Sequence, residues 1–210
     1  MGSHKPFRLL DFLYKKILSS ARLYQSIMQL FSVGQWEKWE DKIFEDLAGK
    51  RVLEVGVGPG KLLLQMAKKG YNVSGIEILP NMATEARRLM KYSGYPVDIR
   101  LESVHNMSFK NEEFDCIVMT FVISEIQDID SAIKEMKRVL KKGGKIIAVS
   151  ATMPQDNNLV ARIILKLIGS QSTHQFKRRN EEYFEKHGFK TVRHDFGPFN
   201  LINKIVAVKK

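Results

Sequence analysis

The apolar positions of the chain change their period repeatedly between residues 50 and 150. Short apolar runs predict strands near 51–55, 72–76, 97–101, 115–120 and 145–150. Between them, apolar residues at helical spacing predict helices near 60–69, 80–92 and 130–141. Because alternating strands and helices build a parallel sheet with helices on both faces, the pattern predicts a doubly wound α/β fold.

Amphipathic patterns precede this central part. Residues 9–31 carry an apolar stripe opposite basic residues, and a second helix is predicted from Trp36 to a stop at Gly49. Such stripes usually pack on the body of a globular protein, although a basic amphipathic helix also suits a membrane interface. Residues 1–4 resemble the remnant of an expression tag and are left out of the fold.

The C-terminal part returns to strand-like patterns. Residues 159–168 predict a short apolar helix within an insertion of about 151–175, at the edge of the sheet where a ligand would enter. A final helix is predicted over 176–187. Residues 188–195 and 201–208 predict an antiparallel hairpin that closes the sheet.

A glycine-rich turn joins the first predicted strand to the first predicted helix. Gly56, Gly58 and Gly60 alternate with other residues, and Glu54 stands two positions before the first glycine. A dinucleotide site has the spacing G-x-G-x-x-G and leaves a helix N-terminus for a pyrophosphate. Because an acid beside the turn suits a cation better than a pyrophosphate, the spacing favours a positively charged cofactor over NAD.

Five segments in order resemble the class I S-adenosylmethionine-dependent methyltransferases. They are the E-x-G-x-G-x-G turn, the second strand ending in Glu77, and residues 101–109, 114–126 and 133–150. The resemblance implies a Rossmann-like, mostly parallel seven-stranded sheet with an antiparallel C-terminal hairpin. It also implies a methyltransferase domain over 49–210, beneath substrate-covering helices over 5–48.

The same resemblance implies S-adenosyl-L-methionine as the cofactor and names its contacts. Glu54 and the three glycines would shape the methionine and sulfonium side, Glu77 the ribose, and Glu102 with Ser103 the adenine. Further expected contacts are Val57, Ile78 and Thr120. The chain departs from the family pattern at Glu102, where aspartate is usual, and at Ser108, where proline is usual.

Methyl transfer from a sulfonium is an in-line displacement, so the protein mainly aligns the reactants and excludes water. A base is needed only when the acceptor must lose a proton. The catalytic candidates are His105 and Glu125, followed by His174 and Tyr183. An exposed acid such as Glu125 is also a common helix cap, and most loop histidines are not catalytic.

Several features narrow the chemistry. Residues 120–123 lack the Asn/Asp-Pro-Pro-aromatic motif of enzymes that methylate base amines, and only Glu125 stands where the arginine-methylating branch has two glutamates. No Cys/His spacing predicts a metal site, and Cys116 is expected to be a buried hydrophobe. The order of motifs resembles the small-molecule branch that includes quinone-biosynthesis and phospholipid-amine methyltransferases.

The charge balance leaves the partner open. The chain has 34 Lys and Arg against 23 Asp and Glu, a net charge of +11 that suits an anionic membrane, nucleic acid or plain solubility. Without an apolar run of membrane-spanning length or a signal peptide, we expect a cytoplasmic protein that is also able to contact membranes peripherally.

The leading hypothesis is a methyltransferase with a partly apolar or lipid-like acceptor. An RNA methyltransferase, less favoured without an RNA-binding module, and a non-catalytic binding module are the alternatives. The oligomeric state is left open.

Overall fold

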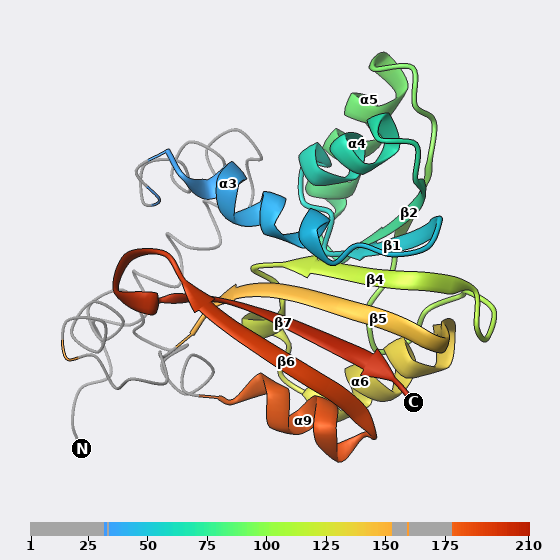
Figure 1. Cartoon of the computed structure of the whole chain (residues 1–210). Helices are drawn as coiled ribbons and strands as arrows, with labels where there is room; N and C mark the ends of the chain where they lie inside the picture. The colour runs from blue at the N-terminus through green and yellow to red at the C-terminus, as the bar shows by residue number, and fades with distance from the viewer. Residues whose placement is uncertain (1–31, 33, 153–158, 160–177) are drawn as a thin grey trace, which may run out of the picture.

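The computed structural model describes residues 32, 34–152, 159 and 178–210, which form a seven-stranded sheet (Figure 1). The strand order is β3-β2-β1-β4-β5-β7-β6. The strands from β3 to β5 run parallel, and β7 runs antiparallel to both β5 and β6. Their bounds are β1 Arg51–Val55, β2 Asn72–Glu77, β3 Asp98–Leu101, β4 Phe114–Thr120, β5 Leu140–Ala151, β6 Phe189–Phe196 and β7 Ile202–Lys209. The predicted sheet and its C-terminal hairpin are confirmed.

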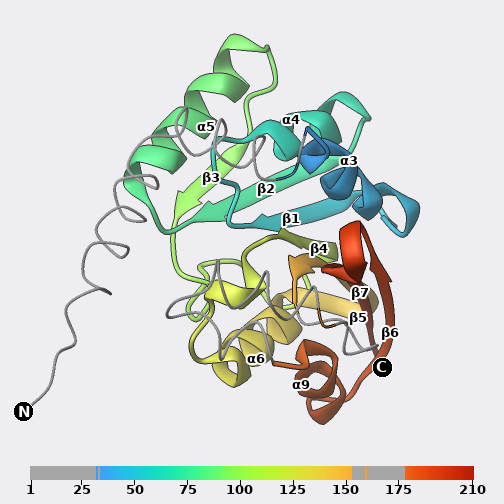
Figure 2. The ribbon, with the colours of Figure 1, turned by 90° about the vertical axis from the view of Figure 1, so that its left-hand side faces the viewer.

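Helices cover both faces of the sheet (Figure 2). One face carries α3 (Trp36–Glu40), the 3₁₀ helix η1 (Asp41–Glu45), α4 (Lys61–Lys68) and α5 (Pro80–Tyr92). The other face carries α6 (Ile129–Val139) and α9 (Asn180–Lys186). The short 3₁₀ helices η2 (Ile123–Glu125) and η3 (Pro198–Asn200) lie in the connections after β4 and β6. The helices predicted at 60–69, 80–92 and 130–141 are therefore present.

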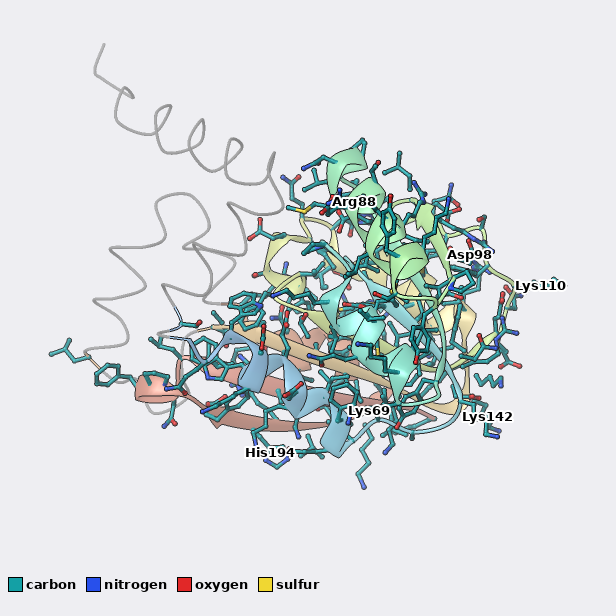
Figure 3. The ribbon with its side chains drawn as sticks, turned by 90° about the horizontal axis from the view of Figure 1, so that it is seen from above. Lys69, Arg88, Asp98, Lys110, Lys142 and His194 are labelled. Carbon is teal, nitrogen blue, oxygen red and sulfur yellow. The ribbon has the colours of Figure 1, made fainter. Side chains whose placement is uncertain are left out.

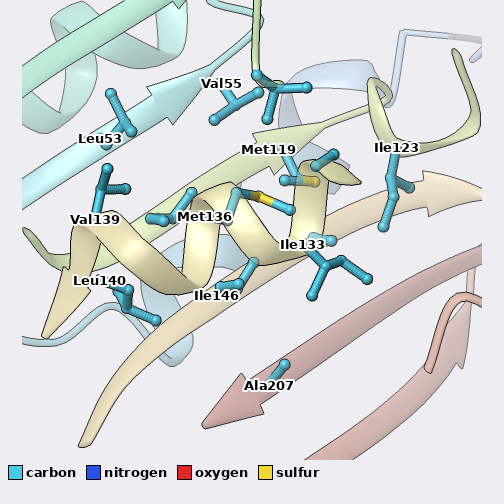
Figure 4. Packing of buried hydrophobic residues seen from close by; sticks show 14 of the residues in the cluster. Leu53, Val55, Met119, Ile123, Ile133, Met136, Val139, Leu140, Ile146 and Ala207 are labelled. Atoms are coloured by element: carbon cyan, nitrogen blue, oxygen red, sulfur yellow. The ribbon is translucent and has the colours of Figure 1, made fainter. Parts of the chain in front are cut away.

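Two hydrophobic clusters hold these layers together. On the α6 side, Ile133, Met136 and Val139 pack against side chains from β1, β4 and β5 (Figure 4). The cluster on the α4 and α5 side includes Cys116 of β4, whose pKa is raised to about 12 mainly by burial. Cys116 therefore behaves as a small buried hydrophobe, as predicted.

The structure differs from the sequence predictions in detail. The helix expected from Trp36 to Gly49 is divided into α3 and η1, and a 3₁₀ turn is a frequent end of an α-helix. The strand β5 begins at Leu140, because that residue pairs with Phe114 ahead of a register shift, and the Gly-Gly turn becomes an irregularity within the strand. The stripe at 9–31, most of the insertion at 151–175 and His174 lie outside the described residues.

Charged side chains lie around the outside of this fold. Figure 3 shows Lys69, Arg88, Lys110 and Lys142 at separate places on the surface, from the α4 end, α5, the loop after β3 and β5. Within the described residues, no helix combines the length and apolar character needed to cross a membrane.

Candidate functional site

The glycine turn between β1 and α4 forms the first wall of the site. The backbone N–H groups of Gly56 and Val57 donate to the carbonyl oxygen of Ile76 on β2, at 2.8 and 3.2 Å. Gly56 has a φ of +73°, and a Cβ there would lie 2.4 Å from Cγ2 of Val122. Gly58 has a φ of +51°, but no described atom lies within 4 Å of its Cβ position. The turn is therefore closely packed at its first glycine and open to a ligand at its second.

Two of the expected contact residues, Val57 and Gly60, have their Cβ side turned toward other parts of the protein. The buried Val57 side chain fills the space above Gly75, whose Cβ would lie 2.3 Å from Cγ1 of Val57. Gly60 precedes α4, and its Cβ position lies 3.0 Å from Ala86 on α5. At these two positions only the backbone is available to a ligand.

Glu77 ends β2 and closes the turn from the side. Its Oε2 accepts a hydrogen bond from the N–H of Gly58 at 2.9 Å. Its Oε1 accepts from the N–H groups of Ile78 at 2.8 Å and Leu79 at 2.9 Å. Three donors thus compensate a carboxylate that is only 6% exposed. Because a carboxylate offers about four lone-pair positions, Glu77 can still accept a hydroxyl group of a ligand.

Glu54 lies on the neighbouring strand in a different environment. Its side chain is 2% exposed, and among the described residues its Oε2 has no hydrogen-bond partner. Burial, together with the negative charges of Glu40 and Glu77, raises the pKa of Glu54 well above its ordinary value. A buried carboxyl oxygen without a donor is costly, and a cation would relieve that cost.

Glu40, the last residue of α3, belongs to the site but was missed in the sequence. Its Oε1 accepts a hydrogen bond from Nε1 of Trp36 at 2.8 Å and from Oγ1 of Thr120 at 3.4 Å. Burial raises the pKa of Glu40 to about 7, although these two hydrogen bonds act to lower it. The signal was present: Glu40 lies four residues after Trp36 and three before Ile43, on the apolar stripe of the predicted helix.

An aromatic pair covers the same corner. Phe121, which follows the end of β4, has a φ of +57°. Its ring stacks on Trp36 with centroids 3.8 Å apart, and Trp39 lies 6.4 Å away in a tilted arrangement. A non-glycine residue in the left-handed region costs on the order of 1–3 kcal/mol, and such strain concentrates at functional sites. The end of β4 is thus held against α3 by Phe121 and by Thr120.

The loop after β3 carries the residues expected to flank an adenine. Glu102 accepts hydrogen bonds from the N–H of Ser108, at 3.0 Å, and from its hydroxyl group. Nδ1 of His105 lies 2.9 Å from Oγ of Ser103, and its Nε2 lies 3.1 Å from the carbonyl oxygen of Asp128. Both ring nitrogens of His105 are therefore engaged in hydrogen bonds that shape this loop.

Exposed apolar side chains lie at the ends of β2 and β3. Ile78 is 67% exposed and Leu101 is 50% exposed, and Leu101 pairs in register with Glu77. They place apolar surface next to the acids Glu77 and Glu102. This combination suits a ligand with a flat, partly apolar ring and neighbouring hydroxyl groups.

The remaining catalytic candidates are spread over the molecule. Glu125 is exposed in η2, within a connection that Arg178 holds by donating to the carbonyl oxygens of Ile123 and Ile126. Tyr183 packs against the hydrophobic cluster on the α6 side, with the guanidinium of Arg178 5.8 Å from its ring centroid. The structure therefore groups Glu40, Glu54, Glu77 and Thr120 but leaves Tyr183 on the core.

Comparison with known proteins agrees with this geometry. Residues 53–148 match the family model described as a methyltransferase domain. Over 143 residues the chain is 31% identical to the demethylmenaquinone methyltransferase of Symbiobacterium thermophilum. This alignment covers 64% of this chain and 57% of that enzyme. Over 104 residues it is 36% identical to the phosphatidylethanolamine N-methyltransferase of Cereibacter sphaeroides. That alignment covers 49% of this chain and 51% of the enzyme. The chain thus spans a little over half the length of these relatives.

Solved structures show the same architecture. A Thermotoga maritima protein described as an S-adenosylmethionine-dependent methyltransferase, possibly a histamine N-methyltransferase, superposes with a TM-score of 0.71 at 20% identity. The superposition covers 92% of this chain and all of the other. This chain therefore shares the fold of that structure, and its residues 53–148 are similar to the methyltransferase-domain family, in agreement with the resemblance carried by the glycine turn.

Proposed function

We propose that the chain transfers the methyl group of S-adenosylmethionine to a small, partly apolar or lipid-like acceptor. The observation that carries the proposal is the carboxyl of Glu54, buried beside an open glycine turn with one oxygen unpartnered among the described residues. A cofactor that carries a positively charged α-ammonium group and a sulfonium supplies the counter-charge that this carboxyl lacks.

The other groups at this edge of the sheet suit the rest of the cofactor. In the proposal, the open backbone at Gly58 receives the amino-acid portion, and Glu77 accepts one ribose hydroxyl group with its remaining lone pair. Ile78 and Leu101 provide apolar surface for the adenine, with Glu102 and Ser103 at its edge. The donor bonds already made to Glu77 support this arrangement because they fix its carboxylate before a ligand arrives.

Catalysis would rest on alignment. When bound, the cofactor supplies an activated methyl group, and transfer needs the acceptor atom in line with it. The stack of Trp36 on Phe121 would exclude water at the α3 corner, while Thr120 would fix the end of β4. Acceptors without a transferable proton need no base. For others, His105 and Glu125 remain the proposed bases, although His105 would first have to release a hydrogen bond.

The acceptor class is supported by the names of the relatives, since a demethylmenaquinone and a phosphatidylethanolamine both join a polar group to an apolar portion. The net charge of +11 would bring the chain to anionic membranes, where such molecules reside. We therefore propose a cytoplasmic protein with peripheral membrane contact. Sedimentation with anionic but not neutral phospholipid vesicles, weakened by salt, is expected; equal behaviour with both would contradict it.

The direct test of the function begins with calorimetric titration. The purified chain should bind S-adenosylhomocysteine at micromolar concentration and show no binding of NAD, because its turn lacks the dinucleotide spacing. Glu54→Gln should weaken this binding, whereas Glu85→Gln, a change at a partly exposed position of α5, should not. Transfer of labelled methyl groups to quinone and lipid extracts should follow. Failure of the chain to bind S-adenosylhomocysteine, or methylation of RNA in preference to these extracts, would overturn the proposal.

A further inference from the structure

Glu40 has features of a ligand-binding residue rather than of a helix cap. Of the two acidic residues of α3, Glu40 is hydrogen-bonded to Thr120 at the end of β4. The other, Glu37, pairs instead with Lys61 of α4 at 3.3 Å. Nε1 of Trp36 and Oγ1 of Thr120 both donate to Oε1 of Glu40. No described hydrogen bond engages its Oε2, so this carboxyl has acceptor capacity to spare.

The carboxyl of Glu54 is the second half of the same feature. Its unpartnered Oε2 is buried, and the charge of Glu40 acts on it more strongly than the charge of Glu77. Two carboxyls that repel each other in a buried corner share a deficit of positive charge. The neighbouring charges do not remove that deficit. Glu37 raises the pKa of Glu40 and Lys61 lowers it, and both effects on the pKa are smaller than that of burial.

An organic cation suits this corner. Among the described residues, no group of three or more His, Cys, Asp or Glu side chains could hold a metal ion. A primary ammonium group, by contrast, carries three N–H donors in different directions, so it can bridge two carboxyls that do not converge on one point. The cofactor carries such a group on its amino-acid portion.

Resting on the proposed function, we propose that Glu40 of α3 and Glu54 of β1 together bind the α-ammonium group of the cofactor's amino-acid portion. The helix before the sheet thus supplies a specificity-determining residue that the glycine turn alone lacks. Because Glu40 has a pKa of about 7 in the free protein and ionises fully beside an ammonium group, binding near neutral pH releases a fraction of a proton to the buffer.

A series of three ligands separates the ammonium group from the rest of the cofactor. S-adenosylmethionine and S-adenosylhomocysteine both carry it, and 5′-methylthioadenosine lacks it. Glu40→Gln should weaken the first two about tenfold each at pH 7.5 and change the third less than twofold, since one charged contact is worth roughly a factor of ten. Glu37→Gln removes the same charge from an exposed position of the same helix and should leave all three affinities unchanged.

Calorimetry in buffers of different ionisation enthalpy gives a second readout. Wild-type protein at pH 7 should release a fraction of a proton on binding S-adenosylhomocysteine, and Glu40→Gln should release less. If wild-type protein binds none of the three ligands, the proposed function itself fails. If wild-type protein binds but Glu40→Gln changes nothing, weakens all three ligands equally, or weakens S-adenosylmethionine alone, the ammonium assignment is overturned while the function stands.

Discussion

Two glutamates at the ends of neighbouring strands show how differently one residue type can serve a site. Glu54 on β1 and Glu77 on β2 are almost equally buried, at 2% and 6% exposure. Glu77 receives three backbone N–H donors, whereas Oε2 of Glu54 receives none from the described residues. Burial alone therefore does not identify a ligand-binding acid. The supply of donors separates an acid that organises the turn from one that requires a ligand.

The largest effect is expected at the compensated acid. Glu77→Ala leaves three backbone N–H groups without their acceptor, so the free energy of unfolding should fall by about 3 kcal/mol. For a chain of this size the melting temperature should fall by roughly 6–12 °C, measured by calorimetry. The control is Glu102→Ala, a more exposed acid bonded to Ser108, which should cost about 1 kcal/mol. A melting temperature unchanged by Glu77→Ala would remove the distinction between the two strand ends.

Substitution of Glu54, whose Oε2 has no donor among the described residues, should change the stability of the ligand-free protein in the opposite direction. The pKa of Glu54 is raised in the folded chain, so its ionisation costs stability as pH rises above the ordinary value of 4.5. Glu54→Gln should therefore raise the melting temperature of the ligand-free protein at pH 8 and change it little at pH 4.5. At the same time, binding of S-adenosylhomocysteine should weaken about tenfold or more. Lower stability at pH 8 would contradict this account.

The intermediate case is Glu40, whose pKa of about 7 defines a pH window. In the folded, ligand-free chain this group stays protonated to higher pH than in the unfolded chain. Its contribution to stability is thus lost between pH 4.5 and about 7. The difference in melting temperature between Glu40→Gln and wild type should be small at pH 4.5, grow through this window and level off above it. A difference independent of pH would mean that Glu40 is not perturbed.

The smallest effect concerns the donor to Glu40. Trp36→Phe keeps a ring against Phe121 but removes the indole N–H that lowers the pKa of Glu40. The pKa should therefore rise, and the pH midpoint for binding S-adenosylhomocysteine should move up by roughly half a unit. Trp39→Phe, on the same helix and farther from Phe121, is the matched control. Equal midpoints in the two variants would show that the hydrogen bond has no influence.

The local parts of this comparison were predictable from the sequence. Gly56, Gly58 and Gly60 mark a turn with positive φ angles, and a strand–turn–helix unit fixes where Glu54 and Glu77 must end up. Glu40 was not predictable because its contact with Thr120 joins residues 80 positions apart and depends on how α3 docks. Phe121 gives no sign of its positive φ either, since only tertiary packing against Trp36 supports that conformation.

The position of β7 also bears on how the chain is made. β7 follows β6 in the sequence but lies between β5 and β6 in the sheet. During synthesis, β6 therefore emerges before the strand that is its neighbour in the sheet, and the edge of β5 stays open until residues 202–209 leave the ribosome. Open strand edges invite pairing with other chains. The nascent protein is consequently most exposed to aggregation just before these residues appear, and truncation ahead of Ile202 should yield an insoluble product.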